Sequence, residues 1–181
     1  IGEISYARAA EVVMKILYLD NAKRNAEINL YINSPGGSVD DTMAIYDTMT
    51  FVGSPISTYC IGRAMSGAAV ILAAGEKGKR FVLPHAKIML HQPWGGVGGQ
   101  AADIQIQAEE ILRTKQMLND VLAHHTGQPV EKIASETERD RYMRPEEALE
   151  YGLIDEILHA EDKEEDKEEN KDKKDSDSEE E

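Results

Sequence analysis

Residues 27–49 read EINLYINSPGGSVDDTMAIYDTM, and this stretch decides the class of fold. Apolar and polar residues alternate over 27–33, which predicts a half-buried strand. The small residues of 34–37 predict a turn, and Ser38, with Asp41 three residues later, is a candidate helix N-cap. A helix should follow, with an apolar stripe formed by Val39, Met43, Tyr46 and Met49. Strand, turn and helix therefore succeed one another directly.

The same order recurs along the chain. Further strands are predicted at 56–61, where Gly62 should end the strand, and at 80–83, 87–90 and 153–158. Helices are predicted at 9–18, 66–74 and 101–125, and between Pro145 and Gly152. The stripe of the long helix consists of Ile104, Ala108, Ile111, Leu118 and Leu122. Repeated strand–helix units predict an α/β layered domain.

The charge of the chain is concentrated at one end. The 181 residues include 34 acidic and 20 basic side chains, for a net charge of −14. Residues 161–181 alone contain 13 acidic residues, 5 lysines and no apolar residue, which is a net charge of −8. Such a segment cannot bury enough apolar surface to offset its ordering entropy. We therefore expect one domain over 1–160 and a disordered acidic tail over 161–181.

Composition also limits the partners. No basic patch stands out, so a nucleic-acid partner is not expected. No apolar run approaches the roughly 18 residues of a membrane span, so no membrane partner is expected either. The single cysteine, Cys60, excludes an internal disulfide framework and fits a reducing compartment. The chain begins at Ile1 with no initiator methionine or signal peptide, and we interpret it as processed or lacking its true N-terminus.

A serine in the second strand–helix turn, residues 62–68, is a candidate nucleophile. Ser66 would lie at a helix N-terminus, beside amide groups able to hold a developing oxyanion. The turn lacks the G-x-S-x-G pattern, and a simple N-cap is the alternative. A nucleophilic serine needs a base, for which His91, at a predicted strand end, competes with His85. The residues alone do not select the orienting acid.

Other chemistries lack their motifs. There is no H-E-x-x-H motif, no paired Cys/His spacing and no calcium loop, so no metal and no cofactor are expected. Residues 75–80 resemble a phosphate loop only superficially, because two residues rather than four separate the glycines. Arg80 also stands where a Ser or Thr should hold magnesium, so the chain should not hydrolyse ATP.

Several motifs, in order, resemble the proteolytic subunits of the Clp protease, the ClpP family, from near Ile1 through Leu158. They are LYINSPGGS (30–38), AIYDTM (44–49), the Ser66 turn, GKRFVLP (78–84), IMLHQP (88–93), HTGQ (125–128), ETERDRYM (136–143) and EALEYGLID (147–155). The resemblance implies a crotonase-like α/β fold of repeated ββα units with a protruding handle helix. It also implies a serine endopeptidase that cleaves unfolded polypeptides and short peptides.

The resemblance assigns roles to individual residues. It makes Ser66 the nucleophile, His91 the base and Asp140 the orienting acid. The backbone amides of Gly37 and Gly67 would form the oxyanion hole. Substrate binding is expected of Ser38, Val39, Pro93 and Trp94, and the glycine-rich segment after Trp94 would pair with extended substrate and join two rings. Arg141 would couple ring contacts to the geometry of the triad.

The resemblance also implies an assembly. Two stacked heptameric rings would enclose the active sites, and an AAA+ unfoldase of the Clp family would supply unfolded polypeptide. The bacterial cytoplasm is the expected location, with plastid stroma or mitochondrial matrix as alternatives. The family's N-terminal axial hairpin is expected to be absent, and the acidic tail has no assigned role.

Departures from the family pattern leave alternatives open. Gly67 follows the nucleophile where the family usually has methionine, and Arg63 replaces a common glutamine. A looser helix start could weaken the oxyanion hole, in which case Gly67→Met should raise turnover. The first alternative function is a catalytically weak or inactive paralogue that serves as a structural ring subunit. The second is an acyl-CoA enzyme of the crotonase family.

Overall fold

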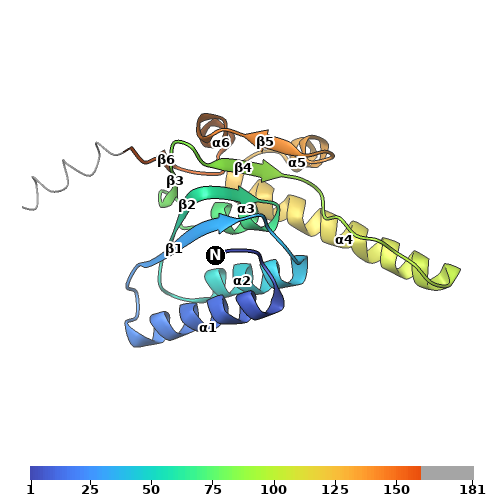
Figure 1. Ribbon diagram of the computed structural model, residues 1–181, viewed down its shortest axis with the longest axis horizontal. Helices are drawn as coiled ribbons and strands as arrows, with labels where there is room; N and C mark the ends of the chain where they lie inside the picture. The colour runs from blue at the N-terminus through green and yellow to red at the C-terminus, as the bar shows by residue number, and fades with distance from the viewer. Residues whose placement is uncertain (160–181) are drawn as a thin grey trace, which may run out of the picture.

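The computed structural model describes residues 1–159, so the expected tail lies outside the described residues (Figure 1). The first half contains α1 (Tyr6–Ala22), β1 (Ile28–Ser34), α2 (Val39–Phe51), β2 (Ile56–Met65), α3 (Gly67–Ala73) and β3 (Arg80–Val82). The second half contains β4 (Lys87–Leu90), α4 (Ala101–Thr126), α5 (Val130–Glu136), β5 (Arg141–Met143), α6 (Pro145–Tyr151) and β6 (Glu156–Ile157). Strands and helices alternate, which confirms the α/β prediction.

The long strand β2 organises the sheet. It pairs in parallel with β1, β3 and β4, while β3 continues to β6 and β4 to the antiparallel β5. β3 pairs with the first half of β2 and β4 with the last three residues, so the sheet branches along one strand. The carboxyl ends of β2 and β4 consequently lie side by side.

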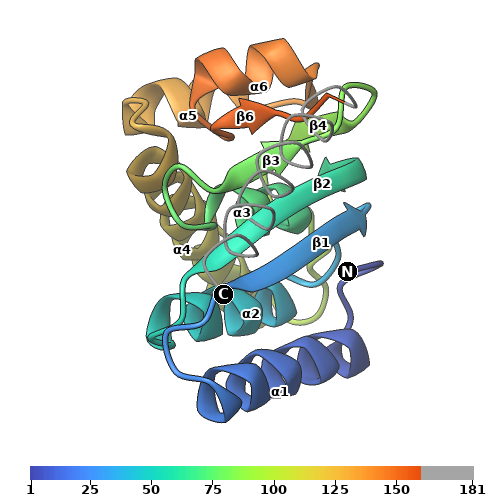
Figure 2. The ribbon, with the colours of Figure 1, turned by 90° about the vertical axis from the view of Figure 1, so that its left-hand side faces the viewer.

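Helices cover the sheet and close the core. Figure 2 shows α1 and α2 beside β1, α3 behind the middle of the sheet, and α5 and α6 at the end of the molecule opposite α1. α3 lies deepest, because its six residues from Ala68 to Ala73 are all buried. Alanine at three of these six positions allows the helix to approach the strands closely. The turn that precedes α3 is thereby fixed on a rigid element.

Two predictions about the first half were wrong in detail. Gly62 does not end β2, which continues to Met65 through an irregularity in its pairing with β1. A Cβ at Gly62 would lie 2.8 Å from the Asn33 side-chain oxygen, so glycine leaves room for that side chain. In α2 the buried face is Thr42, Ile45 and Met49, and the other three predicted stripe residues are only partly buried.

In the second half of the chain, one strand is shorter than predicted and two short elements were not predicted. The predicted strand at 153–158 shortens to β6, because Leu153 and Ile154 instead pack into the core after the left-handed Gly152. The sequence patterns did not predict α5 or β5. Both elements are short, and β5 is a strand because it pairs with β4.

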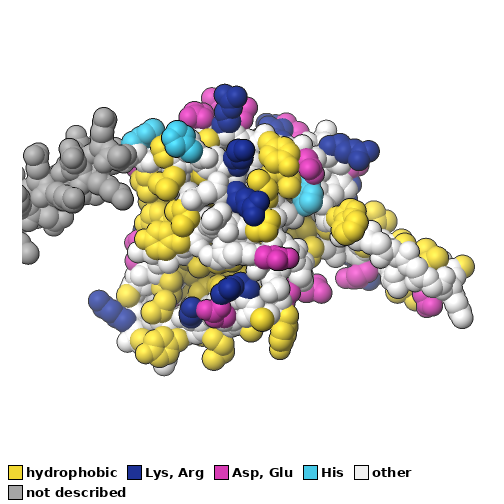
Figure 3. Space-filling model, in the orientation of Figure 1, with side chains coloured by type: hydrophobic (Ala, Val, Ile, Leu, Met, Phe, Trp, Pro, Cys, Tyr) yellow, Lys and Arg dark blue, Asp and Glu magenta, His cyan; other side chains and the backbone are white. Residues whose placement is uncertain are grey.

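The helix α4 projects from the body, and hydrophobic side chains line its exposed part (Figures 1 and 3). Its second half packs on the core through Leu122 and the partly buried Leu118, as predicted. Its first half is open to solvent, with Ile106 67% and Leu112 64% exposed. The predicted stripe therefore covers the core only in the second half of the helix.

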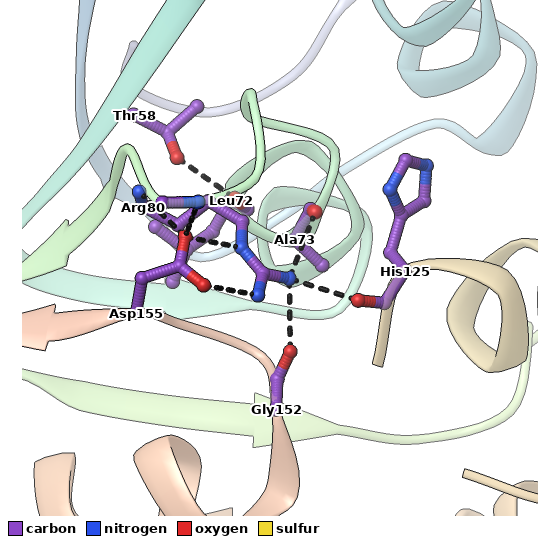
Figure 4. Close-up of polar contacts among 8 residues, drawn as sticks. Thr58, Leu72, Ala73, Arg80, His125, Gly152 and Asp155 are labelled. Carbon is purple, nitrogen blue, oxygen red and sulfur yellow. Dashed lines mark hydrogen bonds and ion pairs between the residues drawn. The ribbon is translucent and has the colours of Figure 1, made fainter. Parts of the chain in front are cut away.

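One buried arginine ties several helix ends to the sheet (Figure 4). Arg80, 4% exposed, donates from Nη1 to the carbonyl oxygens of Ala73, His125 and Gly152, where α3, α4 and α6 end. Its Nε and Nη2 donate to the two carboxylate oxygens of Asp155. A helix C-terminus leaves carbonyls without intrahelical donors, so one guanidinium satisfies three such ends.

Candidate active site

Ser66 occupies a strained turn between β2 and α3. Its φ of 56° and ψ of −127° lie in a region that L residues rarely adopt and that costs on the order of 1–3 kcal/mol. Its amide donates to the Met89 carbonyl at 2.8 Å, which fastens the turn to β4. Its side chain makes no capping hydrogen bond, so the N-cap alternative does not describe it. The turn presents the hydroxyl as a nucleophile elbow does, without the G-x-S-x-G sequence.

Gly36 makes this turn possible, although sequence reasoning missed it. It is buried with a φ of 92°, and a Cβ there would lie 2.7 Å from the Ser66 Cβ. Any side chain at Gly36 would therefore displace the serine. The signal in the sequence was the Gly36-Gly37 pair, which predicted a turn but not what packs against it.

His91 lies beside Ser66 because β2 and β4 are paired in parallel. Met65 is the register partner of Met89, so the residues just beyond the two strand ends come together. His91 Nε2 lies 2.8 Å from Ser66 Oγ, within hydrogen-bond distance. His85, the competing base, lies exposed in the loop between β3 and β4. The geometry therefore selects His91.

Asp140 completes the constellation through the antiparallel pair of β4 and β5. Leu90 is the partner of Arg141, so the next pair outward consists of His91 and Asp140. His91 Nδ1 lies 3.3 Å from Asp140 Oδ1, and the Asp140 side chain is 55% exposed. A base that takes a proton on Nε2 requires the hydrogen on Nδ1 to point to such an acceptor. Three residues predicted to act together are thus brought into one line.

The amides of Gly37 and Gly67 lie at the two turns beside this line. Ile4 bonds to the Gly36 carbonyl and the Ser38 amide, so the backbone groups of Gly37 face away from Ile4. Gly67 is the first residue of α3, where an amide has no intrahelical acceptor. Gly67 thus directly follows Ser66, and Gly37 follows Gly36, which packs against the serine.

The structure gives a steric reason against the expectation that Gly67→Met would raise turnover. A Cβ at Gly67 would lie 2.2 Å from Thr42 Oγ1 and 3.0 Å from Thr42 Cγ2. Thr42 is 1% exposed and donates its hydroxyl to the Ser38 carbonyl, so it cannot move aside freely. Thr42 fills the space that a side chain at residue 67 would need, and it makes glycine necessary there.

An apolar pocket opens next to Ser66 and His91. Its walls come mainly from α2, α3, β4 and α4, and they include Val39, Val70, Leu90, Leu118 and Leu122. Pro93 also lines the pocket, so two of the four predicted substrate-binding residues lie there. Ser38 instead caps α2 by accepting from the Asp41 amide, and Trp94 is 92% exposed.

The comparisons with known proteins bear on this geometry. The sequence profile described as Clp protease matches residues 1–161. The chain is also 55% identical over 157 residues to the ATP-dependent Clp protease proteolytic subunit 1 of Rhodopirellula baltica, which covers 87% of this chain and 69% of that protein. The chain belongs to the Clp protease family. This Clp protease chain is a serine peptidase, and its fold is that of the family.

Other predictions for this Clp protease chain concern its remaining residues. Arg141 forms an ion pair with Glu136 within its own chain. Cys60 is buried without a disulfide, and burial raises the pKa of its thiol to about 11. Within residues 1–159 no cluster of His, Cys, Asp and Glu could hold a metal ion. In the same part of the chain, no helix is long and apolar enough to cross a membrane.

Proposed function

We propose that Ser66, His91 and Asp140 form the catalytic triad of an endopeptidase that cleaves unfolded polypeptides and short peptides. The observation that carries the proposal is the 2.8 Å approach of His91 Nε2 to the hydroxyl of the strained Ser66. His91 takes the proton as Ser66 Oγ attacks a peptide carbonyl, and later delivers it to the leaving amine. Asp140 holds the imidazole tautomer and stabilises its charged form. Water then hydrolyses the acyl-enzyme by the same proton transfers.

The oxyanion of the tetrahedral intermediate is assigned to the amides of Gly37 and Gly67. The turn geometry supports this role, because the Gly37 amide is directed away from its bridge partner Ile4 and Gly67 directly follows the serine as the first residue of α3. Donors fixed in advance toward developing charge supply a large part of the catalysis of acyl transfer. No metal or cofactor is needed for these steps.

Substrate binds in extended form. The apolar pocket takes the side chain that precedes the scissile bond, with Val39 and Pro93 among its walls. Ser38 and Trp94 are assigned to contacts with the substrate backbone farther from Ser66. Recognition of the main chain by a strand leaves side-chain selectivity broad. The glycine-rich residues after Trp94 supply that strand.

The chain works in two stacked heptameric rings that enclose the active sites. The exposed apolar side chains of the projecting α4 support contact with a second copy, because such a surface is costly to leave in water. Arg141, one residue after Asp140, links the ring contact to the triad. An AAA+ unfoldase of the Clp family supplies unfolded chains, and the cytoplasm is the assigned location.

The alternative of an inactive ring subunit is not favoured. Such a subunit has no need of the strained Ser66 turn or of an aligned base and acid, and this chain has both. The same three aligned residues disfavour an acyl-CoA enzyme of the crotonase type.

Hydrolysis of a short fluorogenic peptide tests the proposal. We expect turnover by the full chain, and a loss on the order of 10⁶-fold in Ser66→Ala. His85→Ala is the matched control, because His85 lies away from the site and its loss should leave the rate unchanged. Equal rates in the wild-type chain and Ser66→Ala would refute the triad.

A further inference from the structure

The loop that carries Asp140 is closed at its base by an ion pair. Residues 137–140 connect the last residue of α5, Glu136, to the first residue of β5, Arg141. Arg141 Nη1 lies 2.6 Å from Glu136 Oε1, and both side chains are about two-thirds or more buried. The pair therefore joins the two ends of a four-residue loop.

Tyr151 of α6 packs against this ion pair. The Arg141 guanidinium lies over the Tyr151 ring, 4.7 Å from its centroid, in a cation–π contact. Tyr151 is 4% exposed, and its buried hydroxyl and Glu136 Oε2 have no hydrogen bond of regular geometry. Burial, and then the Glu136 carboxylate, raise the pKa of Tyr151, so the phenol stays neutral. Tyr151 thus contributes mainly a rigid aromatic face against which Arg141 is held.

Asp140 itself has little else to fix it. Among residues 1–159 its side chain makes no hydrogen bond or ion pair besides the contact with His91 at 3.3 Å. The backbone of the loop is held on one side by the Gln92 amide, which donates to the Thr137 carbonyl at 3.0 Å. On the other side it is held by the pairing of Leu90 with Arg141. The position of a half-exposed carboxylate consequently depends on how firmly its loop is closed.

We propose that Glu136, Arg141 and Tyr151 are positioning residues that close the 137–140 loop and hold Asp140 on His91. The proposal deepens the proposed function and rests on it, since it acts through the triad. Glu136 and Tyr151 gain a role that neither the motif nor the pocket assigns. Arg141 acts within its own chain, whether or not it also responds to ring contacts.

The test measures kcat and KM separately for a fluorogenic peptide, with the full chain and its assembly monitored by light scattering. Glu136→Gln and Arg141→Met should lower kcat about 10- to 100-fold, the scale of a misplacement near 1 Å, with KM changed less than about twofold. Arg141→Lys retains a cation for Glu136 and should recover part of the loss. Glu131→Gln, an exposed change on the same helix, should match the wild type.

Two results would overturn the proposal. One is an unchanged kcat in Glu136→Gln and Arg141→Met particles of normal size. The other is a loss of activity in both variants that appears only with loss of assembly and is restored at higher protein concentration. Failure of the proposed function looks different, because Ser66→Ala would then hydrolyse the peptide at the wild-type rate.

Discussion

Two pairs of opposite charge lie in different surroundings in this molecule. Arg80 and Asp155 are 5% and 18% exposed in their side chains, and five hydrogen bonds fix the guanidinium. His91 and Asp140 are 28% and 55% exposed, and their closest approach is 3.3 Å. The first pair joins helix ends to the sheet, and the second leaves its histidine free to exchange a proton. Stability and reactivity are therefore assigned to separate regions, and separate variants should affect them.

Removal of Arg80 should have the largest effect on stability. Arg80→Met leaves the Asp155 carboxylate without its cationic partner and three helix-end carbonyls without their side-chain donor, and should lower the unfolding free energy by about 3–5 kcal/mol. Lys79→Met is the matched control, because Lys79 pairs with Glu27 at the surface and should cost less than about 1 kcal/mol. Urea unfolding measures both. Similar losses of unfolding free energy in the two variants would contradict the claim that Arg80 stabilises the protein by joining helix ends to the sheet.

His125, whose carbonyl accepts a hydrogen bond from Arg80, should make the stability of the protein depend on pH. Burial lowers the pKa of His125 to about 4, and Tyr46 Oη lies 3.1 Å from its Nε2. Between pH 6.5 and 4, His125 binds a proton in the unfolded state but stays neutral in the folded state. The unfolding free energy therefore falls as the pH falls through this range. From pH 7 to pH 5 the loss from this group should be about 2 kcal/mol.

The variant His125→Gln isolates that contribution. Its unfolding free energy should fall less than that of the wild type between pH 7 and pH 5, while His124→Gln, an exposed neighbour, should follow the wild type. If the unfolding free energies of the wild type and His125→Gln fell in parallel with pH, His125 would not be the group responsible for the loss of stability.

Substitutions at Thr42 and Gly67 should give the smallest effect, and the quantity that they change is kcat. Gly67→Ala places a Cβ 2.2 Å from Thr42 Oγ1, which should shift the helix start and lower kcat about tenfold. Thr42→Ala combined with Gly67→Ala removes the two nearest atoms, Thr42 Oγ1 and Cγ2, and should recover most of the loss. A wild-type kcat in Gly67→Ala, or a double variant no better than the single one, would contradict the steric account.

The sequence patterns predicted what depends on local spacing. The half-buried face of β1 and the start of α2 at Ser38 followed from alternation and from an N-cap residue. β5 and the continuation of β2 past Gly62 depend on strand pairing, which a single segment does not reveal. The steric fit of Thr42 to Gly67 was hidden for the same reason, because the two residues meet only in the folded chain.

The site was predictable to a similar extent. Ser66 and His91 stood out as candidates from their places at strand ends, but only the family resemblance selected Asp140 among many acids. The structure supplies the physical reason, since the pairing of β2 with β4 aligns Ser66 with His91, and that of β4 with β5 aligns His91 with Asp140.

Covalent labelling by a fluorophosphonate tests the central claim most directly, because such a reagent reacts with a serine activated by its neighbours. Mass spectrometry of the labelled full chain locates the adduct. We predict one adduct on Ser66 in the wild-type chain and in Arg80→Lys, and almost none in His91→Ala. An unlabelled Ser66 in assembled wild-type protein, or equal labelling in wild type and His91→Ala, would contradict the account.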